Sequence, residues 1–482
     1  MNQRYFGWIL ALVIISLVLI NIVRSDFVLA GASVMLFFLV PMIARPSLFW
    51  MATIITLGCG ISLGLSDELS LNSVLVLSFV ALIIIKLAVW GQQTTQTSMP
   101  RKACAVFLVV VIITAFSRGW GLKIFGSDTW GGMQYVNLIG ALLFYFYSAN
   151  VTISQQQLER TLRWLFILSL IPAAGCLLLY YMPSMKWVEN ILSIEQTELK
   201  WQSTEGVRWV TMQSPAIWMG VFALYIYERR SKFTPAVVGV FALSFIMLGL
   251  SGHRGAAVLL GLTIFVYLLI KRREVRFFQF LKLAAVLVVV VAILYFFVGD
   301  LPRTFQRALA WLPGIEVVHE ANLDASNTSE WRIELWRQLL QMVPDYLWIG
   351  RGLAFNQIDA QSASVLASDA GTQYVFLTAV HLYHNGPLWL ILDLGLAGFV
   401  SGLLLMMSGI AYYGRQLRRI PMGVRWSRAY IVFYSLFVGE CIFFLSVFGA
   451  GKTFCVIIIL ASILEVIVRS AEAERSSVEI NK

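Results

Sequence analysis

The sequence predicts an all-α polytopic membrane protein with about fourteen transmembrane helices, or twelve in the main alternative count. Of its 482 residues, 59% are hydrophobic and only 13% are charged, and the mean hydropathy is +0.79. A soluble fold would carry charge on about a quarter of its residues. The apolar residues also fall into repeated blocks of about 17 to 25 residues, the length at which a helix crosses the hydrocarbon core of a bilayer.

The apolar blocks give the expected spans in chain order. The first block is too long for the apolar core of a secretory signal, and a second block follows at once, so we interpret the first as an uncleaved span. The expected spans are roughly 6–23, 27–43, 48–64, 72–90, 103–117, 134–149, 162–182, 210–227, 234–250, 255–270, 278–298, 386–409, 429–447 and 453–468.

The basic residues predict the orientation of these spans. With the N-terminus inside, the cytoplasmic segments hold the larger share of the Lys and Arg residues, which places both termini in the cytoplasm. Residues 1–298 then hold eleven spans, 299–385 form a large outer loop, 386–468 hold three more spans, and 469–482 form a cytoplasmic tail. The net charge of +10 is explained by this topology, so no nucleic-acid partner is expected.

Two outer segments are too long to be simple connections. Residues 183–209 mix charged residues with tryptophans, a composition that suits a segment lying on the membrane interface. In the larger loop, residues 327–343 place apolar side chains on one helical stripe, with Thr328 or Ser329 as the N-cap and Pro344 as the end. A loop of this size with its own helix is expected to carry function.

Cations on the outer side run against the charge rule, so they are the candidate functional residues. His253 and Arg254 stand at the outer start of one span, and Arg332 lies on the predicted loop helix. Arg351 lies near the middle of the large loop, and His384 stands where the next span begins. Together these side chains would form a cationic cluster facing the outer leaflet.

Each candidate also has an alternative explanation without a catalytic role. The Arg254 side chain would reach outer phospholipid headgroups by snorkelling. Arg332 would be a solvated charge paired with Glu330 or Glu334, and His384 would be an interfacial ring at a helix start.

A metal site is a further alternative for one pair of histidines. His381 and His384 are three residues apart, a spacing that suits two ligands of one ion. However, no cluster of acidic ligands accompanies them, and the chain has no HExxH motif. We therefore expect neither a metal nor another cofactor.

Three motifs share this outer side. Residues 384–398, "HNGPLWLILDLGLAG", resemble the His-[Asn/Ser/Gln]-x9-Gly-x-x-Gly pattern of the bacterial O-antigen ligases. Residues 332–352 resemble the "R…W…P…GxG" run of the wider O-antigen ligase/polymerase superfamily, and "SGHRGA" at 251–256 resembles its Ser-x-x-Arg-Gly segment. The chain is thus similar to this superfamily over about residues 235–410.

The resemblance implies a fold, a place and a reaction. The fold would be of the GT-C type with a large periplasmic loop, in the bacterial inner membrane. The reaction would move a glycan from undecaprenyl diphosphate to an acceptor hydroxyl without a metal. Arg254 and Arg332 would bind the diphosphate, and His384 would serve the acceptor hydroxyl.

Four further residues are candidates for supporting roles. Asn385 would orient the His384 ring or cap the helix that follows it. Arg351, His381 and His253 are candidates by position, because the resemblance assigns them no role. The expected partners are membrane lipids, the lipid-linked glycan, and an acceptor glycan on lipid A–core or on a growing polymer.

Arginine and histidine suit this chemistry. The leaving diphosphate needs charge compensation, and a guanidinium stays ionised and forks onto paired oxygens, which lysine does not. A neutral imidazole accepts a proton near pH 7. Direct displacement at the anomeric carbon would invert its configuration.

Several functions remain open at this point. A ligase, a polymerase for O-antigen or exopolysaccharide, and a protein O-glycosyltransferase share the chemistry and differ in acceptor. The alternative from another class is a polysaccharide or lipid-linked glycan transporter or flippase, for which Lys86, Asp393 and Glu440 would be the ionisable residues within spans.

Overall fold

The computed structural model describes part of the chain, and this part forms two compact units. The described residues are 45–58, 98–121, 131–182, 184–185, 196–198, 207–230, 234–271, 296–301, 305–306, 309–310, 314, 317–355, 377–420 and 425–480. The first unit comprises residues 1–96, 139–194 and 465–482, and the second comprises 97–138 and 195–464.

The first unit contains α3 (Pro46–Gly58), α7 (Gln155–Tyr181) and parts of α6 (Gly132–Ser148) and α19 (Gly451–Ile480). Ser154 starts α7 with a capping box, because its hydroxyl accepts from the Gln157 N–H while the Gln157 side chain accepts from the Ser154 N–H. Helix α7 packs along α3, and the Ser470 hydroxyl accepts from the Ile153 N–H at 2.9 Å.

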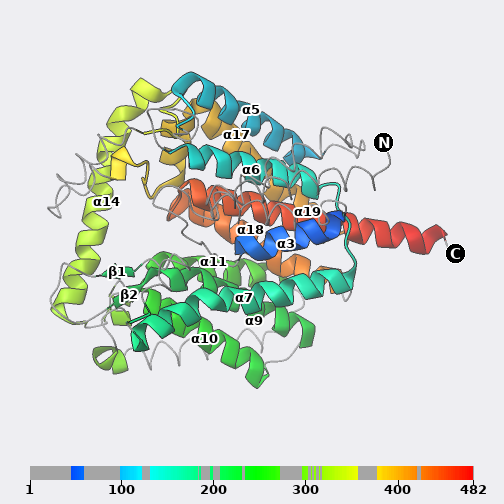
Figure 1. The fold of residues 1–482 in the computed structure, drawn as a ribbon, viewed down its shortest axis with the longest axis horizontal. Coiled ribbons are helices and arrows are strands. Elements are labelled where there is room, and N and C mark those ends of the chain that lie inside the picture. The colour runs from blue at the N-terminus through cyan, green and yellow to red at the C-terminus, as the bar shows by residue number, and fades with distance from the viewer. Residues whose placement is uncertain are drawn as a thin grey trace, which may run out of the picture. The chain divides into compact units, whose positions relative to one another are not determined.

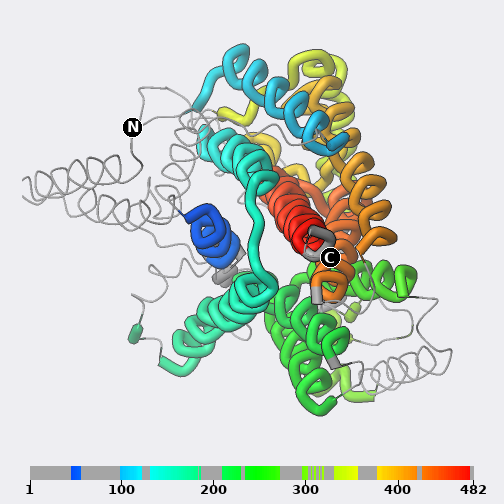
Figure 2. The backbone as a smooth tube through the Cα atoms, turned by 90° about the vertical axis from the view of Figure 1, so that its right-hand side faces the viewer, coloured from blue at the N-terminus to red at the C-terminus, as the bar shows by residue number. Residues whose placement is uncertain are grey.

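The second unit is a bundle of long helices that carries every predicted site residue. Its elements, besides parts of α6 and α19, are α5 (Met99–Arg118), β1 (Gln196–Glu198), β2 (Val207–Trp209), η2 (Val210–Met212), α9 (Gln213–Arg230), α10 (Pro235–Ser251), α11 (Arg254–Lys271), η3 (Val298–Asp300), α14 (His319–Tyr346), α17 (Gly386–Leu417) and α18 (Arg425–Ser446). Helix α9 packs with α10, α11 packs with α18, and α17 packs on both α5 and α18 (Figure 2).

The described residues confirm an essentially helical membrane protein but not the count of fourteen spans. Six helices are long and apolar enough to cross a bilayer: Met99–Arg118, Gln155–Tyr181, Arg254–Lys271, Gly386–Leu417, Trp426–Ser446 and Gly451–Ser477. Each overlaps one predicted span. The predicted spans 6–23, 27–43 and 72–90, and nearly all of 278–298, lie outside the described residues.

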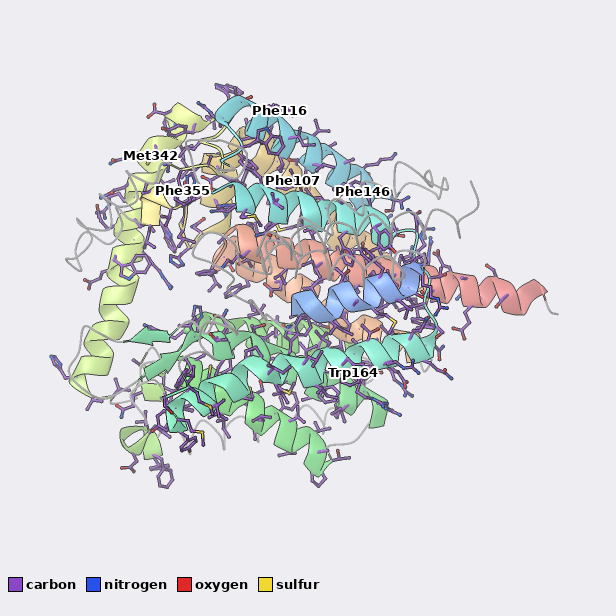
Figure 3. All side chains as sticks on the ribbon, in the orientation of Figure 1. Phe107, Phe116, Phe146, Trp164, Met342 and Phe355 are labelled. Atoms are coloured by element: carbon purple, nitrogen blue, oxygen red, sulfur yellow. The ribbon has the colours of Figure 1, made fainter. Side chains whose placement is uncertain are left out.

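Helix α5 shows the apolar exterior that a bilayer requires. Its inner face buries Phe107, whose ring lies 4.8 Å from that of Phe454, whereas Phe116 is 73% exposed (Figure 3). A helix that is apolar on both faces cannot present its outer face to water at low cost, so the outer face is suited to lipid.

The predicted large loop at residues 299–385 contains the expected helix, with different ends. Helix α14 runs crosswise to α17 and α18 (Figure 1), and its stripe buries Leu335 and Leu339 completely. The predicted N-caps Thr328 and Ser329 are wrong, because the helix already begins at His319. The predicted end at Pro344 is also wrong, since the helix continues through Pro344 to Tyr346 although proline cannot donate the helical hydrogen bond at this position.

The predicted interfacial segment 183–209 contains the only strands among the described residues. β1 and β2 pair antiparallel, with Gln196 opposite Trp209 and Glu198 opposite Val207. This short hairpin is the departure from an all-α architecture within the described parts of the chain.

Candidate active site

Helix α17 is interrupted at Gly395, and the interruption shapes the site. Gly395 has φ 73° and ψ −174°, a conformation that is almost exclusive to glycine. The break deprives the Leu392 and Asp393 carbonyls of their helical partners. The N–H groups of Arg351 and Gly352 replace those partners at 2.6 and 3.0 Å.

The segment that supplies these hydrogen bonds is Gly350-Arg351-Gly352, which follows α14. The Leu396 N–H, on the far side of the break, donates to the Leu347 carbonyl at 2.6 Å. A Cβ on Gly350 would lie 2.5 Å from the Asp393 carbonyl oxygen, so this approach requires glycine. Irregular backbone is tolerated within a span only where other protein groups satisfy it, as they do here.

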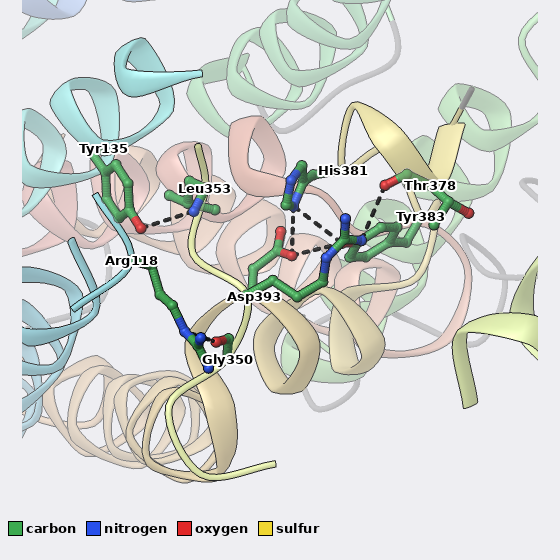
Figure 4. A network of polar contacts seen from close by, with 9 residues as sticks. Arg118, Tyr135, Gly350, Leu353, Thr378, His381, Tyr383 and Asp393 are labelled. Carbon is green, nitrogen blue, oxygen red and sulfur yellow. Dashed lines mark hydrogen bonds and ion pairs between the residues drawn. The ribbon is translucent and has the colours of Figure 1, made fainter. Parts of the chain in front are cut away.

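Two side chains from α5 and α6 hold the same segment from the other side (Figure 4). The Arg118 Nε donates to the Gly350 carbonyl at 2.7 Å, and the Tyr135 hydroxyl accepts from the Leu353 N–H at 2.8 Å. We call this hydrogen-bonded break the α17 junction (residues 347–353 with 392–396).

That loop, residues 381–384, is tied to the junction by a buried polar network (Figure 4). Oδ1 of Asp393 accepts from the Tyr383 hydroxyl and from His381 Nδ1, both at 2.7 Å. The Arg351 guanidinium donates to the Tyr383 hydroxyl at 3.1 Å and to the Thr378 carbonyl at 3.2 Å. Arg351 and His381, predicted as supporting residues, thus belong to one network.

The next residue of the loop, His384, lies among aromatic rings. Its imidazole is 4.8 Å from the Phe448 ring and 5.3 Å from the Trp331 ring, measured between centroids. Trp331 belongs to α14, and the Arg332 guanidinium lies 5.4 Å from the centroid of the Trp331 ring. Trp336, one turn further along α14, donates from Nε1 to the Tyr383 carbonyl at 3.0 Å.

The surroundings of His384 keep its imidazole neutral. Burial, and then the nearby positive charge of Arg332, lower the pKa of His384 from 6.5 to about 4. Its Nδ1 has no hydrogen-bond partner among the described residues. The structure therefore brings two of the predicted site residues together, with an uncharged base beside a guanidinium.

The other predicted residues lie nearby or have structural roles. His253 contacts Phe448 at 6.1 Å between ring centroids, so Phe448 touches both this histidine and His384. Arg254 directly follows His253 and is the first residue of α11. Asn385 caps α17, since its side-chain oxygen accepts from the Leu388 N–H at 3.0 Å.

Two alternative roles were predicted from the sequence: an ion pair for Arg332 and a metal site at His381 and His384. Glu334, one of two predicted partners of Arg332, forms an ion pair with Arg337 at 2.6 Å. His381 and His384 have different neighbours, and no group of three potential metal ligands occurs among the described residues.

Tyr383 was not among the predicted site residues, and Asp393 was predicted only as an ionisable residue within a span. An acidic residue inside an apolar span is a recognisable signal, because an ionisable group in the bilayer needs a partner. Neither its bond to a tyrosine ten residues earlier nor the break at Gly395 has a local signature in the sequence. Both depend on the segment 347–353 meeting α17.

The comparisons with known proteins agree with the motifs. Residues 239–403 match the family model described as O-antigen ligase. This range contains the α17 junction, the loop 381–384 and the arginines at 254, 332 and 351. A comparison with curated proteins finds no match.

Proposed function

We propose that this chain, which matches the O-antigen ligase family model over residues 239–403, belongs to the O-antigen ligase/polymerase superfamily and transfers a glycan from undecaprenyl diphosphate to an acceptor hydroxyl on the periplasmic side of the bacterial inner membrane. Its fold would be of the GT-C type with about fourteen spans, and both termini would be cytoplasmic. The observation that carries the proposal is the neutral His384 imidazole beside the Arg332 guanidinium.

The proposed step is a direct displacement. The acceptor oxygen attacks the anomeric carbon and gives its proton to His384, while the bond from that carbon to the diphosphate oxygen breaks. Arg332 and Arg254 bind the departing diphosphate and balance its growing charge. Attack opposite the leaving group inverts the anomeric centre.

The position of Arg332 links donor binding to the strength of the base. In the free protein its positive charge helps to hold the pKa of His384 low. A diphosphate bound to Arg332 would offset that charge and make the imidazole a better proton acceptor. The base would thus be strongest when the donor is in place.

A substitution of Arg332 tests the proposal. Arg332→Ala is expected to lower kcat/KM by about 10²–10³-fold, the range found when one charge-stabilising group is removed, and Arg332→Lys should restore only part of it. The measurement is transfer from a purified undecaprenyl-diphosphate-linked glycan in proteoliposomes. Arg337→Ala is the control, because Arg337 is an exposed cation on the same helix. Equal activity of Arg332→Ala and Arg337→Ala would contradict the role.

Transfer is also expected to survive a chelator, because the proposed charge compensation comes from arginine. The same proteoliposomes would be treated with EDTA and assayed for initial rate. A rate that collapses and returns with one divalent ion would instead support a metal at His381 and His384.

The acceptor decides between ligase and polymerase. In a deletion strain, loss of all polymer from the lipid A–core would indicate a ligase, and core with single repeats would indicate a polymerase. Loss of glycan from a surface protein would indicate a protein O-glycosyltransferase.

A further inference from the structure

Asp393 is a buried ionisable residue that the proposed transfer does not use. Its side chain is fully buried, as is that of Tyr383, and His381 is 2% exposed. Burying a carboxylate within a span is unfavourable unless donors surround it, and Asp393 has two on one oxygen. Because an apolar residue would fill this position at a lower cost in free energy, the Asp393 carboxylate is expected to have a role other than packing.

The protonation states in this network follow from the contacts. Burial, and then the Asp393 carboxylate, raise the pKa of Tyr383 well above 10, so its hydroxyl keeps the proton that it donates. His381 presents Nδ1 to the same carboxylate oxygen, which requires a proton on Nδ1. Asp393 therefore fixes the orientation of both side chains.

The loop that these side chains belong to has an unusual backbone. His381 has φ 61° and His384 has φ 52°, so both adopt the left-handed conformation that residues other than glycine rarely adopt. Such a conformation persists only when the surroundings impose it. The loop 381–384 needs external restraints.

Tyr383 is restrained both at its side-chain hydroxyl and at its backbone carbonyl. Its hydroxyl is held by Asp393 and Arg351, which belong to the α17 junction, and its carbonyl is held by Trp336 of α14. The residue that follows is His384. Arg332 lies on α14 one turn before Trp336, so the same helix that holds the loop also presents the guanidinium.

We propose that Asp393, Tyr383 and Arg351 are positioning residues for the transfer reaction: they hold the loop 381–384 against α14 so that the His384 imidazole stays beside Arg332. This inference rests on the proposed function, since it gives the network a task only if His384 acts on the acceptor. The three residues do not touch the substrate.

Tyr383→Phe is the main test, because it removes one hydroxyl and keeps the ring. We expect kcat to fall by about 10- to 100-fold, the effect of a small misplacement of a catalytic group, while KM for the lipid-linked donor stays within about 3-fold of the parent value. Ser401→Ala is the matched control. Ser401 is also buried in α17, but its hydroxyl bonds within its own helix, so kcat should not change.

Two readouts distinguish positioning from a loss of folded protein. In a His384→Ala background, adding Tyr383→Phe should cause no further loss, because the network acts only through the imidazole. The acid limb of the kcat/KM profile should also move upward from about pH 4, because a loosened loop exposes His384 to water. A loss of folded protein would instead lower kcat/KM by the same factor at every pH and leave the acid limb at its original pH.

Asp393 itself gives a rescue experiment. Asp393→Ala removes the acceptor of both hydrogen bonds, whereas Asp393→Asn keeps an oxygen that can accept them. We expect Asp393→Asn to retain much more activity than Asp393→Ala. If Asp393→Ala fails to insert into the membrane, Tyr383→Phe alone decides the question.

The outcomes separate this inference from the function on which it rests. If His384→Ala is inactive but Tyr383→Phe has the kinetics of the parent, only the positioning role is overturned. The positioning role would also be overturned if Tyr383→Phe lowered activity further in the His384→Ala background, or if the acid limb of Tyr383→Phe stayed at the pH of the parent. If His384→Ala transfers glycan at the parent rate, the proposed function fails and this inference fails with it.

Discussion

Replacing His384 by alanine is expected to lower kcat for glycan transfer by about 10²–10⁴-fold, the usual contribution of a general base. The acceptor hydroxyl must lose its proton as the new bond forms, and His384 is the proposed acceptor beside Arg332. The measurement is the rate of transfer in proteoliposomes at a saturating concentration of the lipid-linked donor.

The matched control for this substitution is His319→Ala. His319 is the first residue of α14 and is exposed, so its removal takes away an imidazole without touching the loop 381–384. Membrane insertion and protein level should match the parent in both variants. Parent-like transfer by His384→Ala would remove the base from the mechanism.

The pH dependence of transfer follows from the same residue. The pKa of His384 is lowered to about 4, chiefly by burial and then by Arg332. The proton-accepting form therefore prevails above about pH 5, and His384 should limit kcat/KM only as the pH falls through about 4. An acid limb near 6.5, the ordinary pKa of histidine, would mean that His384 is solvated in the working enzyme.

Gly395→Ala is expected to prevent the protein from reaching its folded state. Alanine at φ 73° and ψ −174° would cost about 1–3 kcal/mol for the backbone alone. Its Cβ would also lie 2.5 Å from the Trp348 carbonyl oxygen. Moving Trp348 away would break the bonds from Arg351 and Gly352 to α17, and each buried backbone group left unpaired costs about a further 1–3 kcal/mol.

The measurement for Gly395→Ala is the yield of monodisperse protein in detergent and its thermal unfolding. Gly261→Ala is the control, because Gly261 lies within α11 and a Cβ there would meet no atom within 4 Å. That variant should be at least as stable as the parent, since alanine favours helix by up to about 1 kcal/mol. If the two variants unfold at the same temperature, the α17 junction does not depend on the glycine.

Much of the architecture could be predicted from local properties of the sequence. The six apolar helices in the described residues overlap predicted spans, because a span is a local run of side chains that must match the bilayer. The buried stripe of α14 followed from helical periodicity in the same way. The ends of α14 did not follow, because capping residues are frequent in polar loops and the helix continues two residues beyond Pro344.

The family was predicted from short motifs and is supported by the match over residues 239–403. The roles of Arg254, Arg332 and His384 stay predictions. Gly395 belongs to the motif at residues 384–398, and in the structure it breaks α17 and admits the segment 347–353. The motif contained the residue, but the sequence did not show the conformation that the residue permits.

By itself the sequence predicted a membrane protein, the six apolar helices among the described residues, and the resemblance to a superfamily that the family match over residues 239–403 supports. These properties depend on hydropathy and short motifs, which neighbouring residues define. Only the tertiary structure decided that Asp393 meets Tyr383 and His381, and that His384 lies near Arg332. Such pairings depend on which segments meet in three dimensions, and here they meet because a break in one helix leaves backbone groups that another segment must satisfy.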